Sequence, residues 1–148
     1  MKLPAISVRQ PWATLLAHGL KHYETRSWRA QYEGPLAIHA SATFHPQDRL
    51  WTLQTPEVCR LLAKCGYTNV LELPLGGVLA VGSLSGCYQT HLNAKVISHT
   101  ERILGDWSPN RWAWRLDDVR LLQAPVWVRG HQGLWRCELP DDAIEVQP

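Results

Sequence analysis

The sequence predicts an α+β fold, in which about six strands form a small mixed β-barrel flanked by two or three helices. Short apolar or alternating segments recur along the chain between Gly and Pro residues, as is typical of strands. Few stretches show the spacing of three and four residues that marks an amphipathic helix. A chain of 148 residues has the common size of one domain. We therefore expect residues 1–148 to form a single domain of this architecture.

The N-terminal half alternates strand and helix patterns. Residues 5–8 form a short apolar segment, and Pro11 suits the first turn of a following helix. Trp12 and the leucines three and four positions later have helical spacing, and Gly19 suits the end of that helix. The pattern then predicts strands over 23–29 and 35–40, and helical spacing over 46–64 that Thr55-Pro56 divides into two helices.

The C-terminal half is richer in strand patterns. Residues 76–84 are almost continuously apolar and predict a buried strand, whereas residues 89–110 are polar and predict a loop with a short helix. Strands are also expected over 111–122, 126–129 and 134–139, with glycines 130 and 133 beside the last turn.

Composition excludes several classes of protein. Hydrophobic residues make up 45% and charged residues 19%, which is typical of a globular protein, and the net charge of +2 excludes a polybasic one. No apolar run is long enough for a membrane span or a signal peptide. The four cysteines lack C-x-x-C pairs and zinc-ligand spacing with histidine, so we expect free thiols, no metal and no cofactor. A cytoplasmic protein is the interpretation that fits these features best.

One charged segment stands out near the N-terminus. Arg9, Gln10, Lys21, Glu24 and Arg26 fall within eighteen residues, between apolar runs. An unpaired buried charge is costly, so a core segment would not hold so many charges. This segment therefore predicts the lining of a cleft that binds a polar or anionic ligand, although a surface ladder of ion pairs is the alternative.

The segments that carry this pattern resemble the ASCH family, whose fold is similar to the PUA RNA-binding barrel. The matching segments are Ser7–Trp12, Gly19–Lys21 with Glu24 and Arg26, Gly34–Ser41, Gly77–Ala80, Trp112–Leu116, Pro125–Val126 with Gly130, and Gly133–Trp135.

The resemblance implies a central cleft between the Lys21–Arg26 region, the end of the first strand and the Ile38–Ser41 segment, with RNA or a nucleotide or nucleoside as ligand. One branch of the family hydrolyses an N4-acylated cytidine with a lysine, a threonine three positions later and a distant glutamate. Lys21 matches that lysine, but Glu24 stands at the threonine position. Ribonuclease activity has also been proposed within the family.

Two functions therefore remain open at the level of sequence. In a binding module, Lys21 and Arg26 would hold phosphate, Gln10 and Glu24 would contact base or ribose, and a tryptophan would stack. In a hydrolase, Lys21 and Glu24 would be the catalytic acid and base. A protein-interaction domain without pocket chemistry is a third alternative. The predicted nucleic-acid-binding residues are Arg9, Gln10, Trp12, Lys21, Glu24, Arg26, His39, Ser41 and Trp114.

Several of these residues also have a purely structural interpretation. Trp12 and most other tryptophans would fill the core, and His39 would be a half-buried core residue. Ser41 and His39 could form a nucleophile and base, but neighbours on one strand are poorly aimed at each other and no orienting acid is visible. Trp107, in the polar loop, is expected to be the most exposed tryptophan. The sequence assigns no oligomeric state and no membrane partner.

Overall fold

A mixed sheet of six strands forms the centre of the computed structural model, which describes residues 1–93 and 96–144. The strand order is β2-β5-β4-β3-β1-β6, with β1 and β3 parallel and every other neighbouring pair antiparallel. The strands are β1 (Lys2–Val8), β2 (Tyr23–Arg26), β3 (Gly34–Ala40), β4 (Gly77–Gln89), β5 (Trp112–Trp127) and β6 (Trp135–Glu138).

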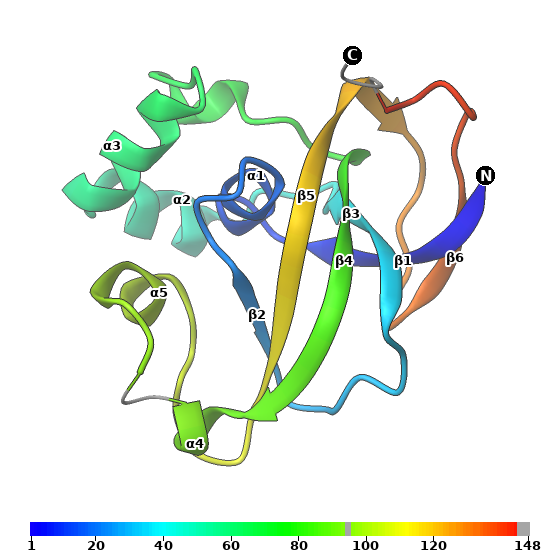
Figure 1. The fold of residues 1–148 in the computed structure, drawn as a ribbon. Helices are drawn as coiled ribbons and strands as arrows, with labels where there is room; N and C mark the ends of the chain where they lie inside the picture. The colour runs from blue at the N-terminus through cyan, green and yellow to red at the C-terminus, as the bar shows by residue number, and fades with distance from the viewer. Residues whose placement is uncertain (94–95, 145–148) are drawn as a thin grey trace.

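The helices gather at one side of this sheet, beyond β2 and β5 (Figure 1). The described residues form five α-helices and one short 3-10 helix, which is more than the two or three helices that the sequence predicts. They are α1 (Trp12–Ala17), α2 (Pro46–Leu53), α3 (Pro56–Lys64), η1 (Val70–Glu72), α4 (Thr90–Asn93) and α5 (His99–Leu104). None of them is long and apolar enough to cross a membrane.

The α+β class is confirmed, but the sheet is not closed into a barrel. The strand order leaves β2 and β6 as edges within the described chain. A side chain spans the gap on the β2 side, where the Arg26 guanidinium donates to the carbonyl oxygen of Ser7 in β1 at 2.8 Å. Backbone pairing therefore stops at β2, and the hydrogen bond from Arg26 to Ser7 connects β2 with β1 in its place.

The long strand β5 corrects the prediction of two separate strands over 111–122 and 126–129. It runs from Trp112 to Trp127 and pairs with β4, with shifts of register along its length. Gly77 of β4 permits the close contact at its far end, because an added Cβ there would lie 2.6 Å from the ring of Trp127. The Thr55-Pro56 break was predicted correctly: α3 begins at Pro56.

Three apolar clusters hold these elements together. The first joins α1 to the sheet through residues such as Leu16, Ile38 and Leu116, and the second lies among β1, β3, β4 and β6. The third links α1, α3 and α5 through Leu15, Leu62 and other leucines. Because α1 takes part in two clusters, it fixes the helices on the sheet and thereby the walls of the cleft described next.

Candidate functional site

A cleft of about 550 Å³ opens between the ends of β1 and β2 and the helices, and we call it the β1–β2 cleft. Four of the residues that the sequence predicts for a binding site line it, and they come from two segments of the chain, 9–12 and 24–26. The lining residues are Ser7, Val8, Arg9, Trp12, Glu24, Thr25, Arg26, Trp51, Ile103, Leu104, Gly105 and Asp106. Its volume lies in the range usual for small-molecule sites.

Two stacked indoles form an apolar wall of this cleft. Trp12 opens α1 and Trp51 lies in α2, with ring centroids 5.2 Å apart and planes inclined by 25°. Both side chains are half-buried, so part of the aromatic surface faces solvent. Arg9 lies 5.9 Å from the Trp12 ring and pairs with Asp48 of α2 at 3.3 Å. The pair gives the wall a cation beside a stacking surface.

An ion pair on β2 forms the opposite side. Glu24 and Arg26 lie two residues apart on the strand, so their side chains share one face. The Arg26 Nη2 atom lies 3.3 Å from the Glu24 carboxylate and also donates to the carbonyl oxygen of Ser7. The side chain of Arg26 keeps 21% of its surface exposed. This ion pair therefore lies in the cleft, and the alternative of a ladder of ion pairs on an open strand face does not describe it.

The remaining wall comes from a region that the sequence analysis treated mainly as a loop. Residues 103–106, at the end of α5 and after it, line the cleft, and Asp106 adds a second carboxylate. Ser98 caps α5 by accepting a hydrogen bond from the N–H of Glu101 at 3.1 Å. A Ser followed three residues later by Glu is a known signal for a helix start, and it could have revealed this helix. Residues 94–95 of the same region lie outside the described residues.

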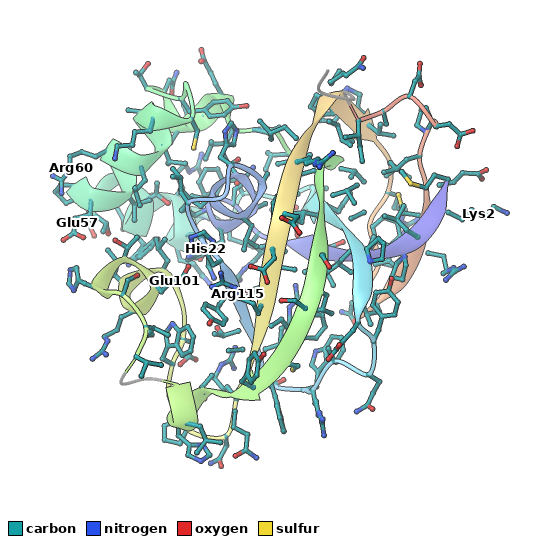
Figure 2. The ribbon with its side chains drawn as sticks, in the orientation of Figure 1. Lys2, His22, Glu57, Arg60, Glu101 and Arg115 are labelled. Carbon is teal, nitrogen blue, oxygen red and sulfur yellow. The ribbon has the colours of Figure 1, made fainter. Side chains whose placement is uncertain are left out.

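The side chain of Glu101 ties this wall to β2. Its carboxylate accepts a hydrogen bond from the backbone N–H of His22, and the two residues lie side by side in Figure 2. Trp107 donates its ring N–H to the carbonyl oxygen of Glu101 at 2.9 Å and is half-buried. The prediction that Trp107 is the most exposed tryptophan is wrong, because Trp127 is 64% exposed.

Two polar residues of the predicted site are buried next to the cleft and do not line it. Gln10 is fully buried, where its amide donates to the hydroxyl of Thr14 and the carbonyl oxygen of Pro74, both at 2.8 Å, and accepts from the N–H of Thr14. Through these contacts the Gln10 side chain connects α1 to the segment that precedes β4. The prediction that Gln10 contacts a base or ribose is therefore not supported by its position.

Lys21 is also buried, with 2% of its surface exposed, and its ammonium donates to the carbonyl oxygen of Tyr23. Burial lowers the pKa of Lys21, while the negative charges of Glu24 and Glu101 oppose that shift. The ammonium is thus a buried countercharge to two carboxylates. Its burial places it away from any phosphate bound in the cleft, in contrast to the sequence prediction.

Trp114, predicted as a stacking residue, belongs to the core. It is fully buried and meets Trp28 edge to face, with centroids 4.7 Å apart. Its ring N–H donates to the carbonyl oxygen of Trp28 at 3.3 Å. Trp114 therefore offers no exposed ring face. The two tryptophans that line the cleft are Trp12, which the sequence predicts for the site, and Trp51, which it does not.

His39 and Ser41 lie at a second cavity, of about 680 Å³, and do not line the β1–β2 cleft. This cavity lies beside the segment that follows β5 and includes Val128, Gly130 and His131 in its lining. Ser7 lines both cavities and therefore connects the two places. Among the described residues, no group of three His, Cys, Asp or Glu side chains is arranged to hold a metal ion.

Comparison with known proteins places this geometry in a family. Residues 6–110 match the family model of the ASCH domain. The chain belongs to the ASCH domain family. This family is associated with RNA binding. The match includes the end of β1, the whole of β2 and α5 and every residue that lines the β1–β2 cleft, so the family assignment rests on the segments that build the site.

Individual relatives support the same assignment. Over 82 residues, or 55% of the chain, the sequence is 51% identical to human activating signal cointegrator 1, and the match spans 14% of that protein's length. Three crystal structures of the ASCH protein ZmASCH from Zymomonas mobilis, two of them mutant proteins, share the fold. Their TM-scores are 0.51–0.53 at 12% identity, with 95% of this chain and 89–91% of those chains covered.

Proposed function

We propose that the β1–β2 cleft binds a nucleotide unit, either within single-stranded RNA or as a free nucleotide. The observation that carries this proposal is the convergence of Arg9, Trp12, Glu24 and Arg26 on one cavity of nucleotide-compatible size. The association of the ASCH family with RNA binding points the same way.

The charges of the cleft suit such a ligand better than a simple anion. Arg26 uses Nη2 for both of its polar contacts, so Nε and Nη1 have no protein acceptor within the described residues and are free to bind phosphate. Glu24 and Asp106 repel phosphate but accept hydrogen bonds from ribose hydroxyls or base amino groups. A ligand with an anionic end and a donor-rich end satisfies both signs of charge.

The indole wall supplies the third element of nucleotide recognition. The exposed parts of Trp12 and Trp51 offer a flat aromatic surface next to Arg9. Stacking of a base on an aromatic side chain contributes roughly 1–3 kcal/mol and tolerates any base. We therefore expect binding with little sequence preference.

A hydrolase acting on a modified nucleoside, with Lys21 and Glu24 as acid and base, is the weaker candidate. Such a pair requires both groups within hydrogen-bond reach of the substrate. Glu24 meets this requirement, but Lys21 is buried and donates to a backbone carbonyl. The position of Lys21 therefore favours binding over this chemistry.

The proposal is tested by titrating a labelled single-stranded RNA oligomer and a nucleoside monophosphate into the protein at about 50 mM and about 200 mM salt. Binding should weaken with salt, because phosphate contacts release counterions. Arg9→Ala should reduce the slope of log affinity against log salt by about 1 for RNA.

Arg60→Ala is the matched control, because Arg60 of α3 is exposed and projects away from the sheet (Figure 2). It removes the same charge without touching the cleft, so its affinity and slope should equal those of the wild type. Equal losses in the two variants, or no measurable binding of either ligand, would overturn the proposal.

A further inference from the structure

A hydrogen-bonded chain of three groups crosses the second cavity. Ser7 of β1 and His39 of β3 are directly opposed in the parallel pair, and Ser7 Oγ lies 3.0 Å from His39 Nδ1. On the other side of the ring, His39 Nε2 lies 2.7 Å from the carbonyl oxygen of Val128. Serine, histidine and an orienting acceptor thus follow one another in the order of a nucleophile, a base and its support.

The direction of each hydrogen bond in this chain follows from the chemistry of its members. The carbonyl oxygen of Val128 can only accept, so Nε2 of His39 carries the ring proton. A neutral imidazole then has a lone pair on Nδ1, which must accept from the Ser7 hydroxyl. The ring N–H of Trp135 donates to Ser7 Oγ at 3.2 Å, which further commits the serine proton to His39.

The surroundings favour the neutral form of His39, in which Nδ1 has a free lone pair. Its surface is 1% exposed, and burial lowers its pKa, with the nearby His131 acting in the same direction and the bond to Val128 opposing. The edge-to-face contact with Trp135, with centroids 5.3 Å apart, holds the ring in place. The imidazole is thus available to take a proton from Ser7.

Gly130 lies directly against this pair. A Cβ at Gly130 would be 2.4 Å from Ser7 Oγ and 2.5 Å from Cε1 of His39, so only glycine lets the backbone pass there. Within the described residues, the backbone N–H groups of Gly130 and His131 donate to no protein acceptor. Free N–H groups next to a nucleophile are the usual donors to a developing oxyanion.

We propose that Ser7 and His39 form a catalytic pair that hydrolyses acyl esters bound in the second cavity. The cavity of about 680 Å³ includes Trp127 and Ala42 in its lining, which suits an apolar acyl group. The partly exposed Ser7 places the hydroxyl at the junction of this cavity with the β1–β2 cleft. This site does not depend on the proposed binding of nucleotides.

The reaction balances with water as its only co-reactant. Ser7 Oγ attacks the ester carbonyl while its proton passes to Nδ1 of His39, and the tetrahedral oxyanion collapses with loss of the alcohol, which takes that proton. Water then attacks the acyl-serine, His39 again accepts a proton, and the acid leaves while Ser7 regains its hydrogen. Nδ1 serves as the base, and the Val128 carbonyl stabilises the imidazolium formed in each half.

The test uses two probes on the full chain. A fluorophosphonate should form a phosphonyl ester on Ser7 with loss of fluoride, mapped by peptide mass spectrometry, and p-nitrophenyl acetate should be hydrolysed with turnover. Ser7→Ala should abolish the label and lower the hydrolysis rate at least about a hundredfold. His39→Gln keeps a donor for the Val128 carbonyl and should show the same loss of rate.

Ser85→Ala is the matched control, because the exposed Ser85 hydroxyl on β4 contacts Asp117 and lies in neither cavity. It should retain the wild-type label and rate. Folding of every variant is checked by its thermal unfolding curve. The proposal fails if folded wild-type protein takes no label at Ser7, or if it hydrolyses the ester no faster than Ser7→Ala. In that case the hydrogen bonds of Ser7 and His39 only stabilise the pairing of β1 and β3.

Discussion

The segments around β1 and β2 supply polar side chains both to the β1–β2 cleft and to the buried positions beside it, yet the two places use these side chains in opposite ways. Arg9 and Gln10 are consecutive, but the Arg9 side chain is 49% exposed at the cleft and Gln10 is fully buried. Arg26 lines the cleft, whereas Lys21 is enclosed. Where a ligand can bind, the polar groups keep unused hydrogen-bonding capacity. Where none can reach, groups of the same chain bind them, as Thr14 and Pro74 do for Gln10 and the Tyr23 carbonyl does for Lys21.

Substitution of a buried polar residue and substitution of a polar residue at the cleft should therefore have different consequences. When a buried polar side chain is removed by substitution, its hydrogen-bond partner is left buried and unsatisfied, so the substitution should lower the free energy of unfolding. An exposed polar group at the cleft has water as a substitute partner, so substitution should lower affinity and leave stability nearly unchanged. The two regions should therefore respond to mutation in separable assays.

The largest effect is expected at the tryptophans. Trp114→Ala removes a fully buried indole and should lower the free energy of unfolding by about 3–5 kcal/mol, measured by urea denaturation. Trp51→Ala removes a half-buried indole at the cleft and should lower the free energy of unfolding less than Trp114→Ala does. When the affinity for RNA is calculated for the folded fraction of each variant, Trp51→Ala should bind roughly tenfold more weakly than the wild type, and Trp114→Ala should bind as tightly as the wild type. If Trp114→Ala weakens binding while leaving stability unchanged, the division between core and cleft is wrong.

The neighbouring pair Arg9 and Gln10 gives a sharper test at smaller magnitude. Gln10→Ala leaves the N–H of Thr14 and the carbonyl oxygen of Pro74 without these partners and should cost about 2 kcal/mol of stability. Arg9→Ala removes the half-exposed cation from an ion pair with the buried Asp48 and should cost less stability than Gln10→Ala, because water can reach the Arg9 side of the pair. Equilibrium unfolding of both variants measures these two losses of stability. Equal losses would contradict the distinction between buried and cleft residues.

The smallest effect concerns the pH dependence of stability. Because burial lowers the pKa of Lys21 below its ordinary value of 10.5, the unfolded chain holds this proton at a pH where the folded chain has released it. The contribution of Lys21 to the free energy of unfolding should therefore be complete above 10.5 and be lost as pH falls through the folded-state pKa.

Lys21→Met isolates that contribution, because the thiols of Cys65, Cys87 and Cys137, whose pKa values are raised by desolvation, are unchanged in the variant. The stability of the wild type should rise relative to Lys21→Met as pH increases toward 10.5, as measured by chemical denaturation at a series of pH values. A difference that stays constant, or falls, would show that Lys21 is not held in a desolvated site.

Much of the architecture follows from the sequence pattern, and the physical reason is local. Pro11 and Gly19 mark the limits of α1, and Pro56 starts α3, because each position constrains the backbone directly. The break predicted near Pro125 is a shift of register and not a strand end, since β4 pairs with β5 on both sides of it, at Leu121 and at Val126. The open edges of the sheet depend on how strands curve in space, which no local pattern encodes.

The candidate site was predictable only in part, for a different reason. The alternation of Glu24 and Arg26 on one strand places both at the cleft, as expected. The buried Gln10 donates to the carbonyl oxygen of Pro74, and the charge of Glu101 acts on the buried Lys21, although both partners lie more than fifty residues away in the sequence. A charged side chain next to an apolar run has the same sequence appearance whether it faces a ligand or a distant backbone carbonyl.

Photochemical crosslinking of a single-stranded RNA oligomer containing 4-thiouridine, followed by mass spectrometry of the modified peptides, tests the location of the ligand most directly. We expect crosslinks in the peptides that hold Trp12, Trp51 or residues 103–106, and we expect these crosslinks to be lost in Trp51→Ala. Crosslinks confined to residues 127–132, or distributed without preference over the surface, would contradict the assignment of the β1–β2 cleft as the binding site.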